Sequence, residues 1–214
     1  MLTQIITVGT LHGYTFELKG DKNFPVGKLD VSTGQDRQQF DVTGSMAEYV
    51  NALVGEADGE PQLKIVGRLA ARTSESGDVY TNLEAVSVGP DNSASLGTVF
   101  NMTGIIDHPI TKPGRNGEFK VPVINLISAD RNGVIPIVPV QLQFNRRDEE
   151  LQSAAMTNGY GQLAEISGTV TSFMSDKGRA YPKFQIGNIS TSDLPEYLSA
   201  FGPQDAAGAQ ADLI

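Results

Sequence analysis

The chain has 214 residues, of which 39% are hydrophobic and 19% charged, and it contains 23 Gly and 11 Pro. This length allows one large domain or two small ones, and the frequent Gly and Pro favour the many turns of an all-β protein. The absence of Cys excludes disulfides and thiolate sites, and a net charge of −9 argues against a protein that coats duplex DNA by charge alone.

The sequence has no apolar run of about 18 residues, the length that a membrane-spanning helix needs. The first ten residues also lack the charged start and apolar core of a secretion signal. We therefore expect a cytoplasmic protein with no membrane contact, lying with the nucleoid or, if the chain is viral, in the host cytoplasm.

The first half shows alternating apolar and polar residues typical of strands. This pattern predicts strands at 7–11, 28–32 and 38–42 and a β-hairpin over 63–89. Between them, residues 45–54 have helical periodicity, and Ser45 with Glu48 fits a capping box at the start of that helix.

The second half repeats this order. Strands are predicted at 102–106, 121–127 and 134–144, a helix at 147–156, and a hairpin over 164–190. The two hairpins align at a constant offset of 101 residues, which places Gly67 over Gly168 and Tyr80 over Tyr181. Such internal repetition indicates two copies of one unit.

Each copy reads strand, strand, strand, helix, strand, strand, the order of the five-stranded Greek-key barrel called the OB-fold. We predict an all-β protein of two tandem OB-fold barrels with one short helix each, at 1–90 and 99–190. Residues 91–98 form the linker, and 191–214 form an acidic tail without a core face. The alternative is a single ten-stranded sandwich whose hairpins match by chance.

The segment from Ile65 to Arg72, IVGRLAAR, followed by Ser76 to Tyr80, resembles bacterial and phage single-stranded DNA-binding proteins. The helical residues 46–50 just upstream resemble that family's helix, whereas Gly168-Thr169-Val170 in the second copy lacks the Arg. The resemblance implies a homodimer, and a tail that recruits replication or repair proteins through its last residues, Asp212, Leu213 and Ile214.

Single-strand binding needs cations near the phosphates and aromatic rings on which unpaired bases stack. Because alternate residues of a strand share a face, Lys64, Arg68 and Arg72 are expected to point outward together, beside Tyr80 of the returning strand. The alternative is that these cations only keep an exposed sheet soluble and block edge pairing.

In the second copy the candidates are cations and aromatic residues in and beside two expected loops. They are Lys112, Arg115, Phe119 and Lys120 in one group, and Phe173, Lys177, Arg179, Tyr181 and Lys183 in the other. The Phe residues expected in the core are Phe24, Phe40, Phe100, Phe144 and Phe184.

No catalytic arrangement is visible. His12 and His108 are the only His residues and lie far from any carboxylate pair in sequence, and no phosphate-binding Gly loop or nucleophile elbow occurs. We therefore expect a non-catalytic protein without cofactor or metal that coats single-stranded DNA in replication or recombination. A protein-interaction or assembly module is the alternative, favoured by the acidic charge and the lack of Trp. RNA binding cannot be separated from DNA binding by sequence.

Overall fold

A computed structural model of the chain describes residues 3–34, 36–73, 79–114, 117–127, 137–144, 149–153, 159–176 and 178–196. Within them, strands dominate, and a helix follows the third strand of each half. The first half contains β1 (Thr3–Lys19), β2 (Phe24–Ser32), β3 (Arg37–Thr43), α1 (Ser45–Glu56), β4 (Gln62–Thr73) and β5 (Val79–Pro90). The second contains β6 (Gly97–Gly114), β7 (Gly117–Ile127), β8 (Ile137–Gln143), α2 (Glu149–Ser153), β9 (Leu163–Met174) and β10 (Ala180–Ser192).

Contacts divide the chain into two compact units. One contains Leu2–Asn101 together with Ser167–Gly187, and the other is centred on Met102–Ile166. The outer part of the β9–β10 hairpin therefore belongs with the strands of the first half. The predicted domain boundaries follow the sequence repeat instead, and they stay a prediction.

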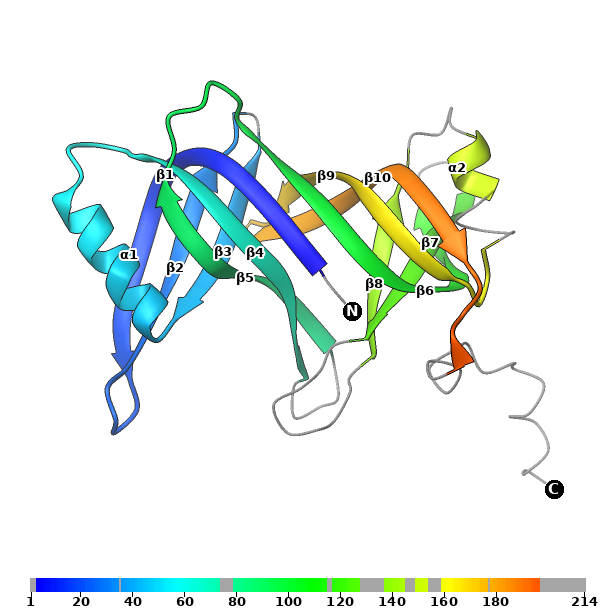
Figure 1. Cartoon of the computed structure of the whole chain (residues 1–214), viewed down its shortest axis with the longest axis horizontal. Helices are drawn as coiled ribbons and strands as arrows, with labels where there is room; N and C mark the ends of the chain where they lie inside the picture. The colour runs from blue at the N-terminus through cyan, green and yellow to red at the C-terminus, as the bar shows by residue number, and fades with distance from the viewer. Residues whose placement is uncertain are drawn as a thin grey trace. The chain divides into compact units, whose positions relative to one another are not determined.

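The strands of the first half form a closed barrel in the hydrogen-bonded order β2-β3-β5-β4-β1, with β1 pairing again with β2 (Figure 1). β1 serves both neighbours because its first part pairs with β4 and its second part with β2, on either side of an irregularity between Leu11 and Gly13. The parallel pairing of Phe40 with Leu83 joins β3 to β5. A barrel of this order with a helix between the third and fourth strands is an OB-fold.

The strands of the second half follow the order β6-β7-β8-β10-β9, with β6 pairing again with β9. This order matches that of the first half, strand for strand. α2 covers five residues of the stretch 147–156 in which a helix is predicted, and the rest of that stretch lies outside the described residues.

The core of the first barrel consists of aliphatic residues and one phenylalanine. Phe40 is fully buried, as are Ile5, Leu29, Val31, Val42, Leu63 and Ile65. α1 covers this core with Ala47 and Val50, and the hydroxyl of Tyr14 donates a 2.9 Å hydrogen bond to the carbonyl oxygen of Ala47. Burial raises the pKa of the Tyr14 phenol, which favours the protonated form that donates this bond.

Two local predictions for this barrel are wrong. The capping box does not form, because Gly44, at a φ of 60°, is the N-cap and makes no side-chain hydrogen bond. Phe24 is not a core residue, since 52% of it is exposed. Phe24 is the first residue of β2 and pairs with Lys19 near the end of the β1–β2 hairpin, which is much longer than predicted. At this end of the hairpin the Phe24 ring lies outside the barrel core. Phe40, Phe100 and Phe184 are buried as predicted, and Phe144 is half-buried.

Candidate nucleic-acid interface

The β9–β10 hairpin carries an exposed group of aromatic and cationic side chains. Phe173 of β9 is 55% exposed and Tyr181 of β10 is 43% exposed. The neighbouring positions Val170, Phe184 and Ile186 are buried, because alternate residues of each strand face the core. Lys183 shares the outward face of β10 with Tyr181, as the alternation predicts.

Each exposed ring has a cation over its face. The Lys183 ammonium lies 5.3 Å from the centre of the Phe173 ring, and the Arg179 guanidinium lies 5.1 Å from the centre of the Tyr181 ring. Both distances fall within the range of cation–π attraction. We call Phe173, Arg179, Tyr181 and Lys183 the hairpin cluster.

The cations of the hairpin cluster are not neutralised by a carboxylate among the residues that the structure describes. Arg179 instead donates a 2.7 Å hydrogen bond from its guanidinium to the side-chain oxygen of Asn82, a neutral acceptor on β5. The cluster therefore presents positive charge and flat apolar rings side by side.

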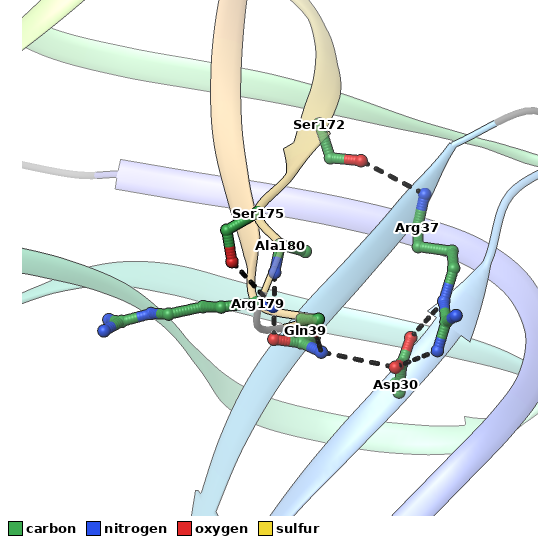
Figure 2. Close-up of polar contacts among 8 residues, drawn as sticks. Asp30, Arg37, Gln39, Ser172, Ser175, Arg179 and Ala180 are labelled. Atoms are coloured by element: carbon green, nitrogen blue, oxygen red, sulfur yellow. Dashed lines mark hydrogen bonds and ion pairs between the residues drawn. The ribbon is translucent and has the colours of Figure 1, made fainter.

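Gln39 of β3 holds the turn of the hairpin in place (Figure 2). Its side-chain oxygen accepts a 3.1 Å hydrogen bond from the backbone N–H of Ala180, and its side-chain nitrogen donates to the carbonyl oxygen of Gly178 at 3.1 Å. The same nitrogen also donates to Asp30 at 3.2 Å. One glutamine side chain thus hydrogen-bonds the backbone on both sides of Arg179 and positions the backbone from which the Arg179 side chain extends.

Further bonds tie β9 to the start of β3. The backbone N–H of Arg37 donates to the Ser172 hydroxyl at 3.2 Å, and the side-chain nitrogen of Gln38 donates to the carbonyl oxygen of Val170 at 3.4 Å. Arg37 is itself held by an ion pair with Asp30. Figure 2 shows Asp30, Arg37 and Gln39 on one side of this seam and the hairpin residues on the other. Hydrogen bonds from β3 therefore hold the two hairpin strands that carry the cluster.

Replacing Gln39 with alanine is expected to loosen the hairpin without unfolding the barrel. Two hydrogen bonds to the turn backbone are lost, each contributing about 0.5–1.5 kcal/mol to the ordered state. Hydrogen exchange at the amide of Ala180 should then become roughly tenfold faster. Gln62→Ala, which removes a side-chain bond to Ser93 on an exposed loop, is the matched control and should leave that rate unchanged. An unchanged exchange rate in Gln39→Ala would show that the glutamine does not hold the turn.

The cations predicted on β4 have acidic neighbours. Lys64 and Arg68 point outward, as the alternation predicts, but Arg68 forms an ion pair with Glu84 of β5, with 2.8 Å between nitrogen and oxygen. Hydrogen bonds with Ser93, and to a smaller degree the charge of Lys64, lower the pKa of Asp91. A phosphate at this face would have to compete with these carboxylates.

The other predicted residues are distributed as follows. Lys112 and Lys120 lie within β6 and β7 rather than in a loop, and their cross-strand partners are Phe119 and Thr111. Arg72 and Tyr80 are cross-strand partners on β4 and β5, but their side chains and that of Phe119 are outside the described part of the structure. Arg115, Lys177, Asp212, Leu213 and Ile214 lie outside the described residues.

Sequence reasoning missed the residues that position the hairpin. Gln39 and Asn82 contact groups about 100 to 140 positions away along the chain, and single polar residues at such separations carry no local pattern. Asp30 accepts hydrogen bonds from Arg37 and Gln39 of the neighbouring strand, so its role depends on theirs. In the described part of the chain, no group of His, Asp and Glu side chains is arranged to hold a metal ion, and no helix is long and apolar enough to cross a bilayer.

Two solved structures share this architecture. The single-stranded DNA-binding protein from Thermus aquaticus superposes with a TM-score of 0.65 and 16% sequence identity over 98% of each chain. A deletion mutant of that protein, which also carries an arginine-to-alanine substitution, gives a TM-score of 0.65 and 15% identity over 91% of this chain and 97% of its own. The shared fold is the OB-fold. No protein-family model matches the sequence, and no curated protein matches it closely enough to count as a relative. At this level of identity the likeness establishes the fold alone.

Proposed function

We propose that this chain binds single-stranded DNA without chemical change and that the hairpin cluster is a principal contact surface. The observation that carries the proposal is the pairing of two exposed rings, Phe173 and Tyr181, each with a cation over its face. The likeness in fold to a single-stranded DNA-binding protein supports it.

The cluster has the chemistry that an unpaired strand requires. A base exposes its flat face only when it leaves the duplex stack, and stacking on an aromatic side chain contributes about 1–3 kcal/mol per base. Lys183 and Arg179 lie within 6 Å of the rings, close enough for a phosphate beside a stacked base to meet them. Stacking on every kind of base makes such a surface tolerant of sequence.

Duplex DNA suits the chain less well. It hides its base faces, so the rings of Phe173 and Tyr181 would gain nothing, and binding would rest on charge. A chain with a net charge of −9 is repelled by a phosphate backbone everywhere except at local cationic surfaces. We therefore propose selectivity for the single strand.

Close contacts at glycines support the proposal that the chain contains two copies of the barrel. A Cβ at Gly67 would lie 3.0 Å from the carbonyl oxygen of Glu84, and one at Gly168 would lie 2.0 Å from that of Gln185. All four residues match at the repeat offset of 101. A Cβ would overlap the backbone of the next strand at Gly168 and would be tight against it at Gly67, so a close strand approach favours glycine at the same point of both hairpins.

The wider role follows from the same proposal. The chain would coat single strands transiently exposed in replication or recombination, as a homodimer, with Asp212, Leu213 and Ile214 available to partner proteins. Lys64, Arg68, Arg72 and Tyr80 of the first barrel, and Lys112, Arg115, Phe119, Lys120 and Lys177 of the second, remain proposed further contacts. Stacking and phosphate contacts do not distinguish DNA from RNA, so the binding assays need single strands of both DNA and RNA.

Neutralising the two cations of the cluster tests its charge contribution. In the double variant Arg179→Gln, Lys183→Gln, the slope of log affinity against log salt should become shallower by about 1.4, because each lost phosphate contact removes roughly 0.7 on a single strand. The control is Lys19→Gln, Lys28→Gln, which removes the same charge from residues that are ion-paired with Glu17 and Asp41. Equal slopes in the two double variants would show that the cations of the hairpin cluster do not contact the DNA phosphates. If the unaltered chain bound no oligonucleotide, a protein-interaction module would be the better description.

A further inference from the structure

His108 and Tyr160 of the second half stack on one another at the surface. The centres of the two rings lie 3.8 Å apart, and the angle between their planes is 25°. Tyr160, just before β9, is half-buried, whereas His108 of β6 is exposed. Because Tyr160 covers one face of the imidazole, the side open to solvent is the opposite face. We call these two residues the stacked pair.

The backbone of His108 is held in place by its neighbours. Its N–H donates a 2.6 Å hydrogen bond to one carboxylate oxygen of Asp107, and the other oxygen accepts a 2.7 Å bond from the side chain of Asn125 on β7. Pro109 follows and favours an extended backbone at His108. The register of β6 against β7 shifts between Asp107 and Ile110, so His108 lies at an irregularity of the strand pair. The imidazole therefore projects from a fixed point.

The first half has a histidine at the corresponding irregularity. His12 is exposed and lies where the pairing of β1 with β2 shifts, between Leu11 and Gly13. Among the residues that the structure describes, His12 stacks on no aromatic ring, whereas His108 stacks on Tyr160. The two histidines thus differ in their support.

The loops that precede β4 and β9 contact the first strand of each half in the same way. The N–H of Leu11 donates a 2.9 Å hydrogen bond to the carbonyl oxygen of Pro61, and the N–H of Ile106 donates a 3.0 Å bond to that of Gln162. Pro61 and Gln162 are related by the repeat offset of 101. The positions of the two loops can therefore be compared residue by residue.

By that offset Tyr160 takes the place of Gly59. Gly59 has no side chain, and the strands of the first half nevertheless form a closed barrel. The barrel fold by itself therefore does not require a ring at this position. What the ring of Tyr160 adds to the second half is support for an exposed imidazole.

The chemistry of the stacked pair suits an unpaired base. Imidazole is one of the aromatic groups on which unstacked bases are bound, and a base on its open face would extend the stack that Tyr160 begins. Lys112 of β6 and Lys120 of β7 lie farther along the same hairpin. In the described part of the chain neither lysine is ion-paired, so both can meet phosphates of the bound strand.

We propose that the open face of His108, supported by Tyr160, binds one base of the single strand, so that the second half has a base-stacking site of its own. This inference rests on the proposed function. The site is separate from the hairpin cluster, because the two share no residue and belong to different compact units.

Fluorescence anisotropy of the full chain with a labelled oligo-dT tests the site. His108→Ala should weaken binding about tenfold, as expected for the loss of one base stack. His108→Phe keeps a flat ring on Tyr160 and should bind within about twofold of the unaltered chain. The matched control is His12→Ala, which removes an exposed histidine without a described ring partner and should leave the affinity unchanged.

Photocrosslinking tests the same contact without any substitution. When iododeoxyuridine replaces thymidine in the oligonucleotide, irradiation of the complex should link a base to His108, and mass spectrometry of the digested protein locates the link. Crosslinks confined to the hairpin cluster, or equal binding by His108→Ala and the unaltered chain, would overturn this inference and leave the proposed function standing. If the unaltered chain bound no single strand, the proposed function would fail and this inference with it.

Discussion

The double variant Phe173→Ala, Tyr181→Ala is expected to bind single-stranded DNA about a hundredfold more weakly than the unaltered chain. Each ring removed costs roughly 1–3 kcal/mol of base stacking, and 1.4 kcal/mol corresponds to a tenfold change in affinity. Both rings are about half exposed, so their loss leaves no cavity in the core. Fluorescence anisotropy with a labelled oligo-dT gives the two dissociation constants.

The control for this effect is Tyr49→Ala. Tyr49 is 47% exposed, close to the 43% of Tyr181, but it lies on α1 rather than on the β9–β10 hairpin. Its removal should change the affinity by less than about twofold. If the hairpin double variant bound as tightly as the Tyr49 variant, the bases would have to stack elsewhere on the protein.

Phe40→Ala is expected to destabilise the first barrel by about 3–5 kcal/mol, the usual cost of deleting a buried aromatic ring and leaving a cavity. Phe40 is fully buried at the junction where β3 meets β5. Its ring also lies under Gly67, where a Cβ would approach it to 2.8 Å. Chemical denaturation followed by circular dichroism measures the difference in the free energy of unfolding.

Phe24→Ala is the control for the stability measurement on Phe40→Ala. The sequence places both phenylalanines in predicted core positions, yet Phe24 is 52% exposed. Its replacement should cost less than about 1 kcal/mol, in line with surface substitutions elsewhere. Equal losses of stability in the two variants would contradict the burial described for this barrel.

The strand order could be predicted because local sequence patterns mark the strands of each half. Alternation in 63–89 and 164–190 marks two hairpins, and the repeat offset that aligns Gly67 with Gly168 links the halves. Burial in β4 follows that alternation, with Leu63, Ile65 and Leu69 inside and Lys64 and Arg68 outside. The alternation in the sequence matches burial in the structure because a shift of one residue in strand register would turn every core side chain toward solvent.

The errors arise where the local pattern ends. Alternation does not reveal where a hairpin leaves the body of the barrel, so Phe24 looks like a core residue although it lies near the hairpin end. Ser45 and Glu48 have the right spacing for a capping box, but Gly44 takes the cap position because its positive φ turns the chain directly into the helix.

The aromatic and cationic members of the candidate site were predicted, but the residues that support them were not. Phe173 follows from alternation in the second hairpin, and Arg179, Tyr181 and Lys183 were expected in and beside the loop that follows it. Gln39 contacts Gly178 and Ala180 from a strand 139 and 141 positions away. The pairing of Arg68 with Glu84 also depends on strand register, and it changes what an apparently free cation on β4 offers to a ligand.

The central claim is that the chain prefers unpaired strands, and one titration tests it most directly. A labelled oligo-dT of about 35 nucleotides and a duplex of equal length are titrated by fluorescence anisotropy over a series of salt concentrations. We predict tight binding of the single strand that weakens as salt rises, and much weaker binding of the duplex at every salt concentration. Equal affinity for both would contradict the proposed preference for unpaired strands. No binding to the single strand even at low salt would contradict the proposed function and leave the OB-fold without a nucleic-acid role.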